Sequence, residues 1–218
     1  MRARSAAPKP VRRRSDGLRT RAEIVAAAER FFAERGFEAT RLDDVAIEVG
    51  IRRAAIFYHF GDKQELYAAV LDEVFREWRL PTGGKAAERL EAALTGWIDY
   101  VARRPSVARM ILREAASFQP GEVSPFMRAG SAAIEWFRAV IDEGIASGEL
   151  EPRLDSYRFM SRMGAMTVFH FAAMSWLTLN TPVDPSSRAE LDAHKRDVVD
   201  MARGMLGIRP ETGSGGTR

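Results

Sequence analysis

The sequence predicts an all-α fold in two parts, a compact bundle of about four short helices followed by a larger helical domain. Apolar residues recur at helical spacing from Thr20 onward, and no stretch alternates strictly enough for a β-strand. Gly and Pro interrupt the periodic segments, most clearly at Pro81-Thr82-Gly83-Gly84, which separates the two parts. A chain of 218 residues is long enough to bury a substantial core without disulfides.

A first helix is expected over Arg19–Arg35, and Gly36 ends it. One face of this helix carries apolar residues three or four positions apart, namely Ile24, Ala27, Ala28 and Phe31. A short second helix is expected over Arg41–Val49, with Thr40 as its N-cap and Asp43 at the third helical position.

Gly50 ends the second helix, and a third short helix is expected from Arg52 to Tyr58. The run Asp62-Lys63-Gln64-Glu65 resembles a capping box and starts a fourth helix. Apolar residues recur in that helix at every fourth position: Leu66, Val70, Val74 and Trp78.

Five longer helices are expected beyond the break, over Ala86–Arg103, Pro105–Phe118, Pro125–Ser147, Ser156–Leu179 and Ser187–Leu206. Within the fourth of these, the 17 residues from Met163 to Leu179 carry no formal charge. This length is at the short limit for a membrane span, and the segment contains His170, so we expect a buried helix and no membrane association.

The composition excludes several kinds of chemistry. The chain has no Cys, which excludes disulfides, thiolate metal sites and cysteine nucleophiles, and its 3 His residues are too scattered for a multi-histidine metal site. It contains no Gly-rich phosphate loop and no HExxH spacing. We therefore expect no catalytic residues, no metal and no cofactor, and we do not expect an enzyme.

The net charge of +3 is concentrated at the N-terminal end. Residues 1–63 hold 14 Lys and Arg against 9 Asp and Glu (+5), whereas residues 64–218 hold 19 against 21 (−2). Within residues 1–21 the count is 8 against 1. This asymmetry favours a polyanionic partner for the N-terminal part, with a merely solubilising basic arm as the alternative.

The second and third helices have the properties of a helix-turn-helix motif. Ala46 supplies the small residue where two helices cross closely, and Gly50 supplies the tight turn. The shared core consists of Val45, Val49, Ile51 and Ile56. In such motifs the second helix enters the DNA major groove with its N-terminal residues, here Arg52 and Arg53, whose guanidinium groups suit guanine O6 and N7.

A longer set of residues carries a specific resemblance. Its members are Thr20, Arg21, Ala22, Glu23, Ile24, Ala27, Ala28, Phe31, Phe32, Gly36, Phe37, Thr40, Val45, Ala46, Gly50, Ile51, Ile56, Phe57, Tyr58, His59, Phe60, Lys63 and Leu66. With this spacing the segment resembles the N-terminal domain of TetR-family transcriptional regulators. The resemblance implies a three-helix helix-turn-helix DNA-binding domain, joined through a fourth helix to a larger helical ligand-binding and dimerisation domain.

The resemblance also implies a function. It points to a cytoplasmic homodimer that binds double-stranded DNA at a palindromic operator, most often a repressor released by a small effector, here apolar or amphipathic. The expected DNA-binding residues are Thr40, Arg41, Arg52, Arg53, Ala55, Tyr58, His59 and Lys63. Arg52 and Ala54 stand where the family often has Ser and Gly, and Phe57 replaces a frequent Tyr; these departures concern which sequence is bound, not whether DNA is bound.

Some residues of this segment are also expected to have structural roles. Thr40 is expected to cap a helix and to contact a phosphate, and Lys63 to contact a phosphate. Phe57 and Phe60 are expected in the core. Residues 12–14, three consecutive arginines, form either a solvated chain or an arm that enters the minor groove.

The second domain is rich in Met and aromatic residues, which form either ordinary core or a ligand pocket. The candidate pocket residues are Trp97, Tyr100, Met110, Trp136, Met166, Phe169 and His170, with Tyr100 or His170 as a polar contact. Arg109, Arg113 and Arg162 are either contacts for an anionic group or surface charges. A dimer interface is expected on the last two helices, at Met160, Gly164, Thr167, Phe171, Met201 and Met205.

These assignments divide the chain into four parts: a basic flexible arm (1–18), a helix-turn-helix domain (19–65), a ligand-binding and dimerisation domain (66–207) and a disordered tail (208–218). Two other functions stay open at this point. One is an enzyme with a helical fold, which a detected turnover would support. The other is an architectural DNA-binding protein that responds to no ligand, which the absence of any ligand effect on DNA binding would support.

Overall fold

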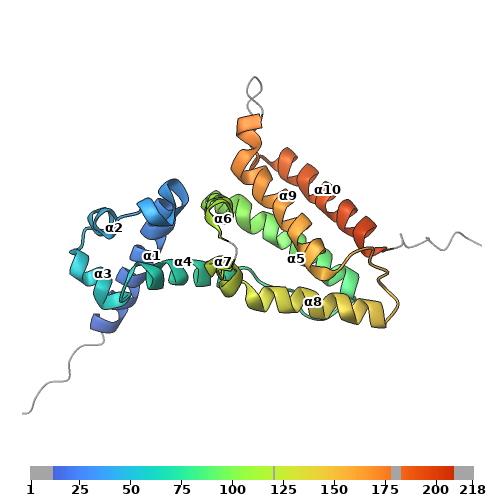
Figure 1. The fold of residues 1–218 in the computed structure, drawn as a ribbon, viewed down its shortest axis with the longest axis horizontal. Coiled ribbons are helices and arrows are strands. Elements are labelled where there is room, and N and C mark those ends of the chain that lie inside the picture. Colours follow the sequence, from blue (N-terminus) through green and yellow to red (C-terminus); the bar gives the residue numbers. More distant parts are fainter. Residues whose placement is uncertain (1–11, 120, 178–182, 209–218) are drawn as a thin grey trace, which may run out of the picture. The chain divides into compact units, whose positions relative to one another are not determined.

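The computed structural model describes residues 12–119, 121–177 and 183–208, and Figure 1 shows the helices that they form. In chain order these are α1 (Arg12–Ala39), α2 (Leu42–Val49), α3 (Arg53–His59), α4 (Lys63–Glu77), α5 (Ala86–Arg103), α6 (Pro105–Ser117), α7 (Pro125–Ala129), α8 (Ser131–Ala146), α9 (Ser156–Leu177) and α10 (Arg188–Leu206). The chain divides into two compact units, residues 1–70 and 71–218, and the division falls within α4.

Several expected helix boundaries need correction. Helix α1 begins at Arg12, so residues 12–18 are helical rather than part of a flexible arm. Residues 1–11 and 209–218, where the rest of the arm and most of the tail were expected, lie outside the described residues. Helix α5 has the expected bounds, and Ser187 caps α10 by accepting a hydrogen bond from the backbone N–H of Glu190.

The single helix expected over Pro125–Ser147 is two helices, because the chain leaves the helical path at Gly130 (φ −81°, ψ 0°). Gly130 packs directly against an aromatic ring: a Cβ atom at this position would lie 2.6 Å from Cζ of Phe75. A side chain at this position would therefore clash with α4, a constraint that the local sequence does not reveal.

The N-terminal unit is built on α1, which is interrupted at Gly36 (φ 79°, ψ 172°). The break expected there is confirmed. Thr40 does not cap α2, however: Arg41 occupies the N-cap position without a side-chain bond, and the Thr40 hydroxyl donates to the carbonyl of Gly36 at 2.7 Å. The core of this unit contains fully buried apolar residues from all four helices, including Ile24, Ala28, Phe32, Val45, Ile56 and Leu66.

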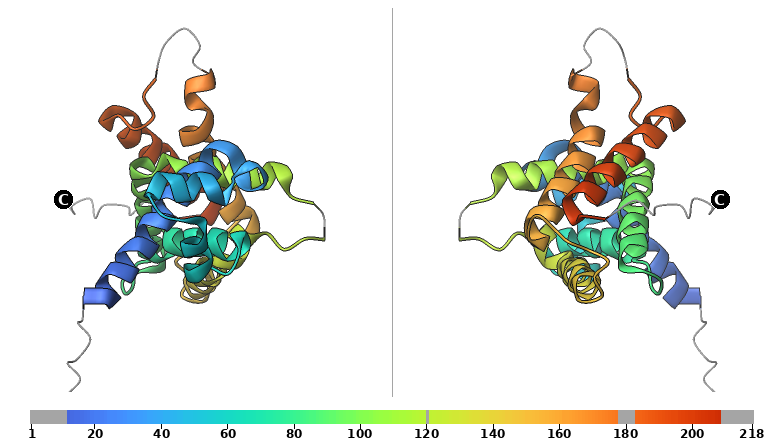
Figure 2. Two further views of the ribbon diagram at one scale, coloured as in Figure 1. Left: turned by 90° about the vertical axis from the view of Figure 1, so that its left-hand side faces the viewer. Right: turned by 90° about the vertical axis from the view of Figure 1, so that its right-hand side faces the viewer.

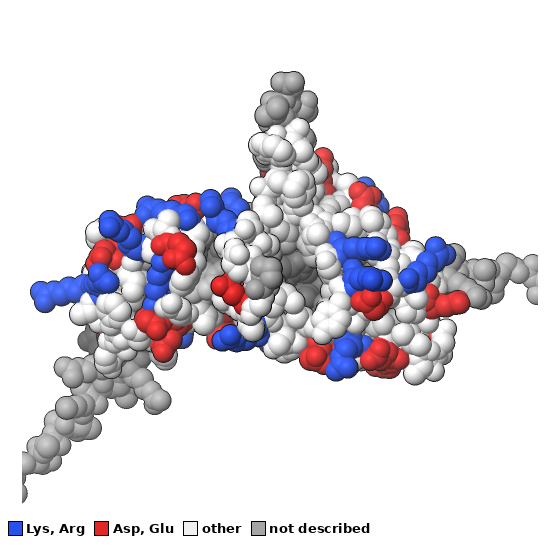
Figure 3. All heavy atoms as spheres, in the orientation of Figure 1, with Lys and Arg blue, Asp and Glu red and all other residues white. Residues whose placement is uncertain are grey.

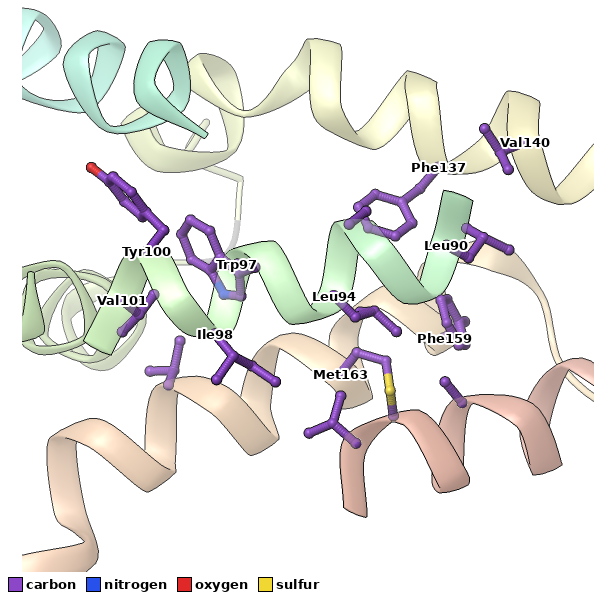
Figure 4. Packing of buried hydrophobic residues seen from close by; sticks show 14 of the residues in the cluster. Leu90, Leu94, Trp97, Ile98, Tyr100, Val101, Phe137, Val140, Phe159 and Met163 are labelled. Carbon is purple, nitrogen blue, oxygen red and sulfur yellow. The ribbon is translucent and has the colours of Figure 1, made fainter. Parts of the chain in front are cut away.

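The C-terminal unit is organised around α5, which packs against α6, α8, α9 and α10. Leu90, Ile98 and Val101 of α5 are completely buried, and Figure 4 shows side chains of α8 and α9 pointing toward this helix. The indole rings of Trp78 and Trp97 lie 4.8 Å apart between ring centroids. Helices α9 and α10 pack side by side, as both views of Figure 2 show.

The described residues contain neither a membrane-spanning helix nor a metal-binding cluster. No helix in the described ranges is both long and apolar enough to cross a lipid bilayer. No group of three or more His, Asp or Glu side chains in those ranges is arranged to hold a metal ion.

Candidate functional site

The turn between α2 and α3 has a tightly defined backbone. Gly50 adopts a left-handed conformation (φ 74°, ψ 31°), its N–H donates to Ile47 O at 3.1 Å, and the N–H of Ile51 donates to Ala46 O at 2.9 Å. This pair of bonds is the Schellman arrangement that ends a helix. Ala46 is buried, as expected for the residue where the two helices cross closely. The turn therefore sets the direction of α3.

Helix α2 is tied to its neighbours by three ion pairs. Arg30 of α1 pairs with Glu48 at 2.7 Å, and Arg35 of α1 pairs with Asp44. Arg53 of α3 pairs with Asp43 at 2.9 Å. The acidic residues of α2 thus neutralise much of the surrounding basic charge, and Figure 3 shows acidic and basic atoms interspersed over this unit.

Two arginines at the expected DNA-binding surface have no such partner. Arg41 and Arg52 are exposed, and no hydrogen bond or ion pair involves either side chain within the described part of the chain. Each immediately precedes a helix, α2 or α3. An exposed, unneutralised guanidinium at such a position suits a phosphate or a base edge.

The exposed side of α3 also carries aromatic residues. Tyr58 is 86% exposed, and Phe57, which we expected in the core, is exposed as well. Phe60 is buried, in agreement with expectation. Ala55 and His59 are half-buried, and the centroid of the His59 ring is 5.2 Å from that of Tyr58 and 6.2 Å from that of Phe60.

Two other expected DNA contacts have structural roles. Thr40 is 2% exposed, which leaves no surface for a phosphate, so we remove it from the candidate contacts. The ammonium of Lys63 donates to Glu38 O at 3.0 Å and lies 4.5 Å from the centroid of the Phe37 ring. Lys63 therefore ties the start of α4 to the end of α1, and its remaining N–H groups stay available for a phosphate.

The C-terminal unit contains a cavity of about 610 Å³, within the usual range of ligand pockets. Its inner wall is made of buried residues from α5, α8 and α9, among them Leu94, Trp97, Phe137, Phe159 and Met163 (Figure 4). No charged side chain lines it among the described residues. Exposed lining residues form a rim on α6, α7 and α9: Leu112, Ala115, Met127, Tyr157, Ser161, Ala165 and Phe169.

The expected pocket residues divide into two groups. Trp97 and Phe169 line the cavity. Tyr100, Met110 and His170 are instead buried elsewhere, and Trp136 and Met166 pack against the outside of the core cluster. Further residues line the cavity from α4 and α8, such as Phe75 and Phe137, and were not among the predicted pocket residues. Helical periodicity marks both core and cavity-lining residues as apolar, so no signal in the sequence separates them.

His170 of α9 stacks on His194 of α10, with ring centroids 4.0 Å apart. Nε2 of His170 lies 3.3 Å from the carbonyl oxygen of Pro185, whereas Nε2 of His194 is buried without a hydrogen-bond partner in the described structure. Burial and, to a smaller extent, the nearby His170 together lower the pKa of His194 to about 4, against an opposing effect of Asp197. His194 is therefore held neutral.

Most of the expected interface residues are covered within the subunit. Thr167 and Phe171 are buried, Met160 and Gly164 line the cavity, and Met205 packs against the core cluster. Only Met201, which is 45% exposed, offers a large free apolar surface. The exposed side of α9 carries a different set of apolar residues: Ala165, Phe169, Trp176 and Leu177.

The geometry agrees with comparisons to known proteins. Residues 24–70 match the family model for bacterial regulatory proteins of the tetR family, and residues 87–202 match the tetracyclin repressor-like C-terminal domain. The transcriptional activator FasR of Mycolicibacterium smegmatis is 26% identical over 178 residues, which cover 78% of each chain.

Solved structures share the fold. The regulator SCO4942 of Streptomyces coelicolor superposes with a TM-score of 0.67 at 22% identity, covering 87% of this chain and 99% of that one. The regulator FadR of Bacillus subtilis, solved with stearoyl-CoA, gives a TM-score of 0.64 at 17% identity, with coverages of 86% and 99%. Together the two family models cover the helix-turn-helix unit and most of the C-terminal unit. The chain belongs to the TetR family, and it is a DNA-binding transcription regulator rather than an enzyme.

Proposed function

We propose that this regulator is a homodimeric repressor that binds a palindromic operator and is released from it by an amphipathic small molecule. The apolar cavity of the C-terminal unit is the observation that carries the proposal. FasR is described as an activator, so the direction of regulation needs its own test. Because the target is chromosomal DNA, the proposal includes action in the cytoplasm.

DNA contact is assigned to the N-terminal end of α2, to the exposed side of α3 and to the start of α4. The proposed base and phosphate contacts are Arg41, Arg52, Arg53, Tyr58 and His59, with Ala55 close to the bases and Lys63 at a phosphate. The exposure of Arg41, Arg52 and Tyr58 supports this assignment. A helix-turn-helix dimer reads two half-sites about 34–36 Å apart, which is why a palindrome is expected.

Dimerisation is assigned to the outer faces of α9 and α10. Phe169 and Trp176 of α9 and Met201 of α10 are large apolar side chains left exposed by the single chain. Large exposed apolar patches mark protein interfaces. A two-fold interface would bring the same residues together from both subunits.

The effector is assigned to the cavity, with its apolar part inside and its polar part at the rim. Four rim residues, Leu112, Met127, Tyr157 and Ser161, are each followed by an exposed arginine: Arg113, Arg128, Arg158 and Arg162. The cavity interior suits an apolar chain, and the proposal places an anionic head outside it, near these arginines. The stearoyl-CoA bound by FadR has this amphipathic character, which supports the same class of ligand here.

The test uses stearoyl-CoA, stearate and coenzyme A alone as probes. We expect at least one of the two acyl compounds to raise the melting temperature and to weaken binding to an operator fragment selected in vitro, and coenzyme A alone to do neither. Transcription from a promoter carrying the operator should fall when the protein is added. If no acyl probe changes DNA affinity, the ligand-independent architectural DNA binder becomes the better account.

A further inference from the structure

Arg53, the first residue of α3, is held from two sides. Its Nη1 donates to Oδ2 of Asp43 on α2 at 2.9 Å, and its guanidinium carbon lies 5.3 Å from the centroid of the Phe57 ring. The side chains of the ion pair are 54% and 55% exposed, so the pair is open to a ligand while the guanidinium is already oriented.

We propose that Asp43 and Phe57 are positioning residues that make the Arg53–Asp43 pair a reader of one G·C base pair. This inference rests on the proposed role of Arg53 as a base contact. A guanidinium has five N–H donors, and Asp43 uses one of them. The remaining donors are sufficient for the two-bond contact with O6 and N7 of guanine.

The carboxylate of Asp43 also contributes to the discrimination between base pairs. In a G·C pair the N4 amino group of cytosine is a hydrogen-bond donor in the major groove, close to guanine O6, and a carboxylate accepts from that amino group. A carboxylate facing an acceptor such as thymine O4 is repelled instead. Asp43 therefore favours G·C at the position that Arg53 reads and disfavours an adjacent acceptor. Because the pair is formed before DNA binds, less side-chain entropy is lost in the complex.

Two neighbouring features provide internal comparisons. Arg52 is also exposed at the start of α3 but has no partner among the described residues, which suits a phosphate contact without base preference. Asp44 lies next to Asp43 in the first turn of α2 and also pairs with an arginine, Arg35, but that arginine belongs to α1. Loss of Asp44 thus removes one ion pair and one acidic residue from the same helix turn without touching Arg53.

The experiment selects bound sequences from a library of duplex DNA with a randomised central segment. The wild type is compared with Arg53→Ala, Asp43→Asn and Asp44→Asn. Arg53→Ala identifies the operator position that Arg53 reads. At that position we expect Asp43→Asn to reduce the preference for G·C about tenfold, within the range that one good base contact provides. Asp44→Asn should leave the preference unchanged, and binding to random duplex should not weaken in either Asp variant.

Phe57→Leu provides a second test, because it keeps apolar bulk at an exposed position and removes only the ring beneath Arg53. We expect it to lower the G·C preference severalfold while the melting temperature stays close to that of the wild type. If Asp43→Asn does not fold, the result for Phe57→Leu decides.

Two results would overturn the inference. The first is that the DNA motif selected by the wild type changes in Arg53→Ala but is the same in Asp43→Asn and Phe57→Leu. This outcome would not contradict the proposed operator binding. The second is an equal loss of preference in Asp44→Asn, which would show a general effect of α2 stability. A wild type that enriches no motif at all overturns the proposed operator binding together with the inference.

Discussion

The imidazole rings of His170 and His194 lie face to face between α9 and α10, with their planes 10° from parallel. Both side chains are buried, and a positive charge on His194 is unfavourable at this buried position beside His170. The packing of these two helices therefore depends on His194 remaining neutral.

This dependence predicts a loss of stability in mild acid. The pKa of His194 is about 4 in the folded protein and about 6.5 when unfolded, so the unfolded chain binds more protons between these values. The contribution of neutral His194 to the free energy of unfolding is fully present above about pH 6.5 and is lost as the pH falls toward 4. His194→Phe keeps a ring against His170 and cannot titrate. The free energy of unfolding, measured with urea, should fall less from pH 7 to pH 5 in this variant than in the wild type. An equal fall in both proteins would contradict the prediction.

Gly164→Leu should make the regulator insensitive to its effector. Gly164 lines the cavity, and a Cβ atom there has no neighbour within 4 Å, so the new side chain enters open space. Replacing Gly within a helix also favours folding by up to about 1 kcal/mol. DNA binding and melting temperature should be retained, while an acyl probe no longer releases the DNA. Gly130→Ala is the contrasting variant, because its Cβ would meet Phe75 at 2.6 Å and should lower the melting temperature.

Arg52→Ala should weaken DNA binding without affecting the fold. The side chain is exposed and makes no hydrogen bond or ion pair among the described residues. Its removal therefore takes away one phosphate neutralisation and lowers the slope of log affinity against log salt concentration by about one. Lys63→Ala should weaken binding and also lower the melting temperature, because Lys63 holds Glu38 O and the Phe37 ring. Affinities measured over a series of salt concentrations, together with melting curves, distinguish the two effects.

Gly50→Ala should destabilise the N-terminal unit through backbone strain alone. Gly50 has φ 74°, and an added Cβ meets no atom within 4 Å, so no steric clash contributes. A left-handed conformation costs a residue with a Cβ about 1–2 kcal/mol. Gly96→Ala on α5 is the control, because that position is also free of close neighbours but does not have a positive φ. The prediction is wrong if Gly50→Ala and Gly96→Ala change the free energy of unfolding by the same amount.

Met201→Glu should dissociate the proposed dimer. Met201 lies on the outer face of α10, where a charge would be buried without a partner in the assembly. Ile145→Glu is the matched control, because Ile145 is 47% exposed, similar to Met201, but lies on α8. Sedimentation should give a species near the 24.3 kDa of one chain for Met201→Glu and about twice this mass for the control. A wild type that sediments as a monomer would refute the assignment.

The sequence by itself determined the features that depend on neighbouring residues. Helical periodicity located the helices, and the break at Gly36 and the turn at Gly50 followed from the conformational freedom of glycine. The helix-turn-helix motif could be predicted for this reason, since its core residues and its turn lie within a short stretch of chain. The bounds of α5 were predictable because Pro105 and the end of the periodic pattern mark its C-terminal limit.

The tertiary structure alone decided what each surface packs against. Apolar spacing shows that α9 is covered on several sides, but not that Thr167 and Phe171 are buried within one chain while Phe169 and Trp176 remain exposed. Likewise, the close approach of Gly130 to Phe75 and the pairing of Asp43 with Arg53 are contacts between different helices. Local sequence determines the direction in which a side chain leaves its helix, whereas its partner is set by the packing of segments that are distant in sequence.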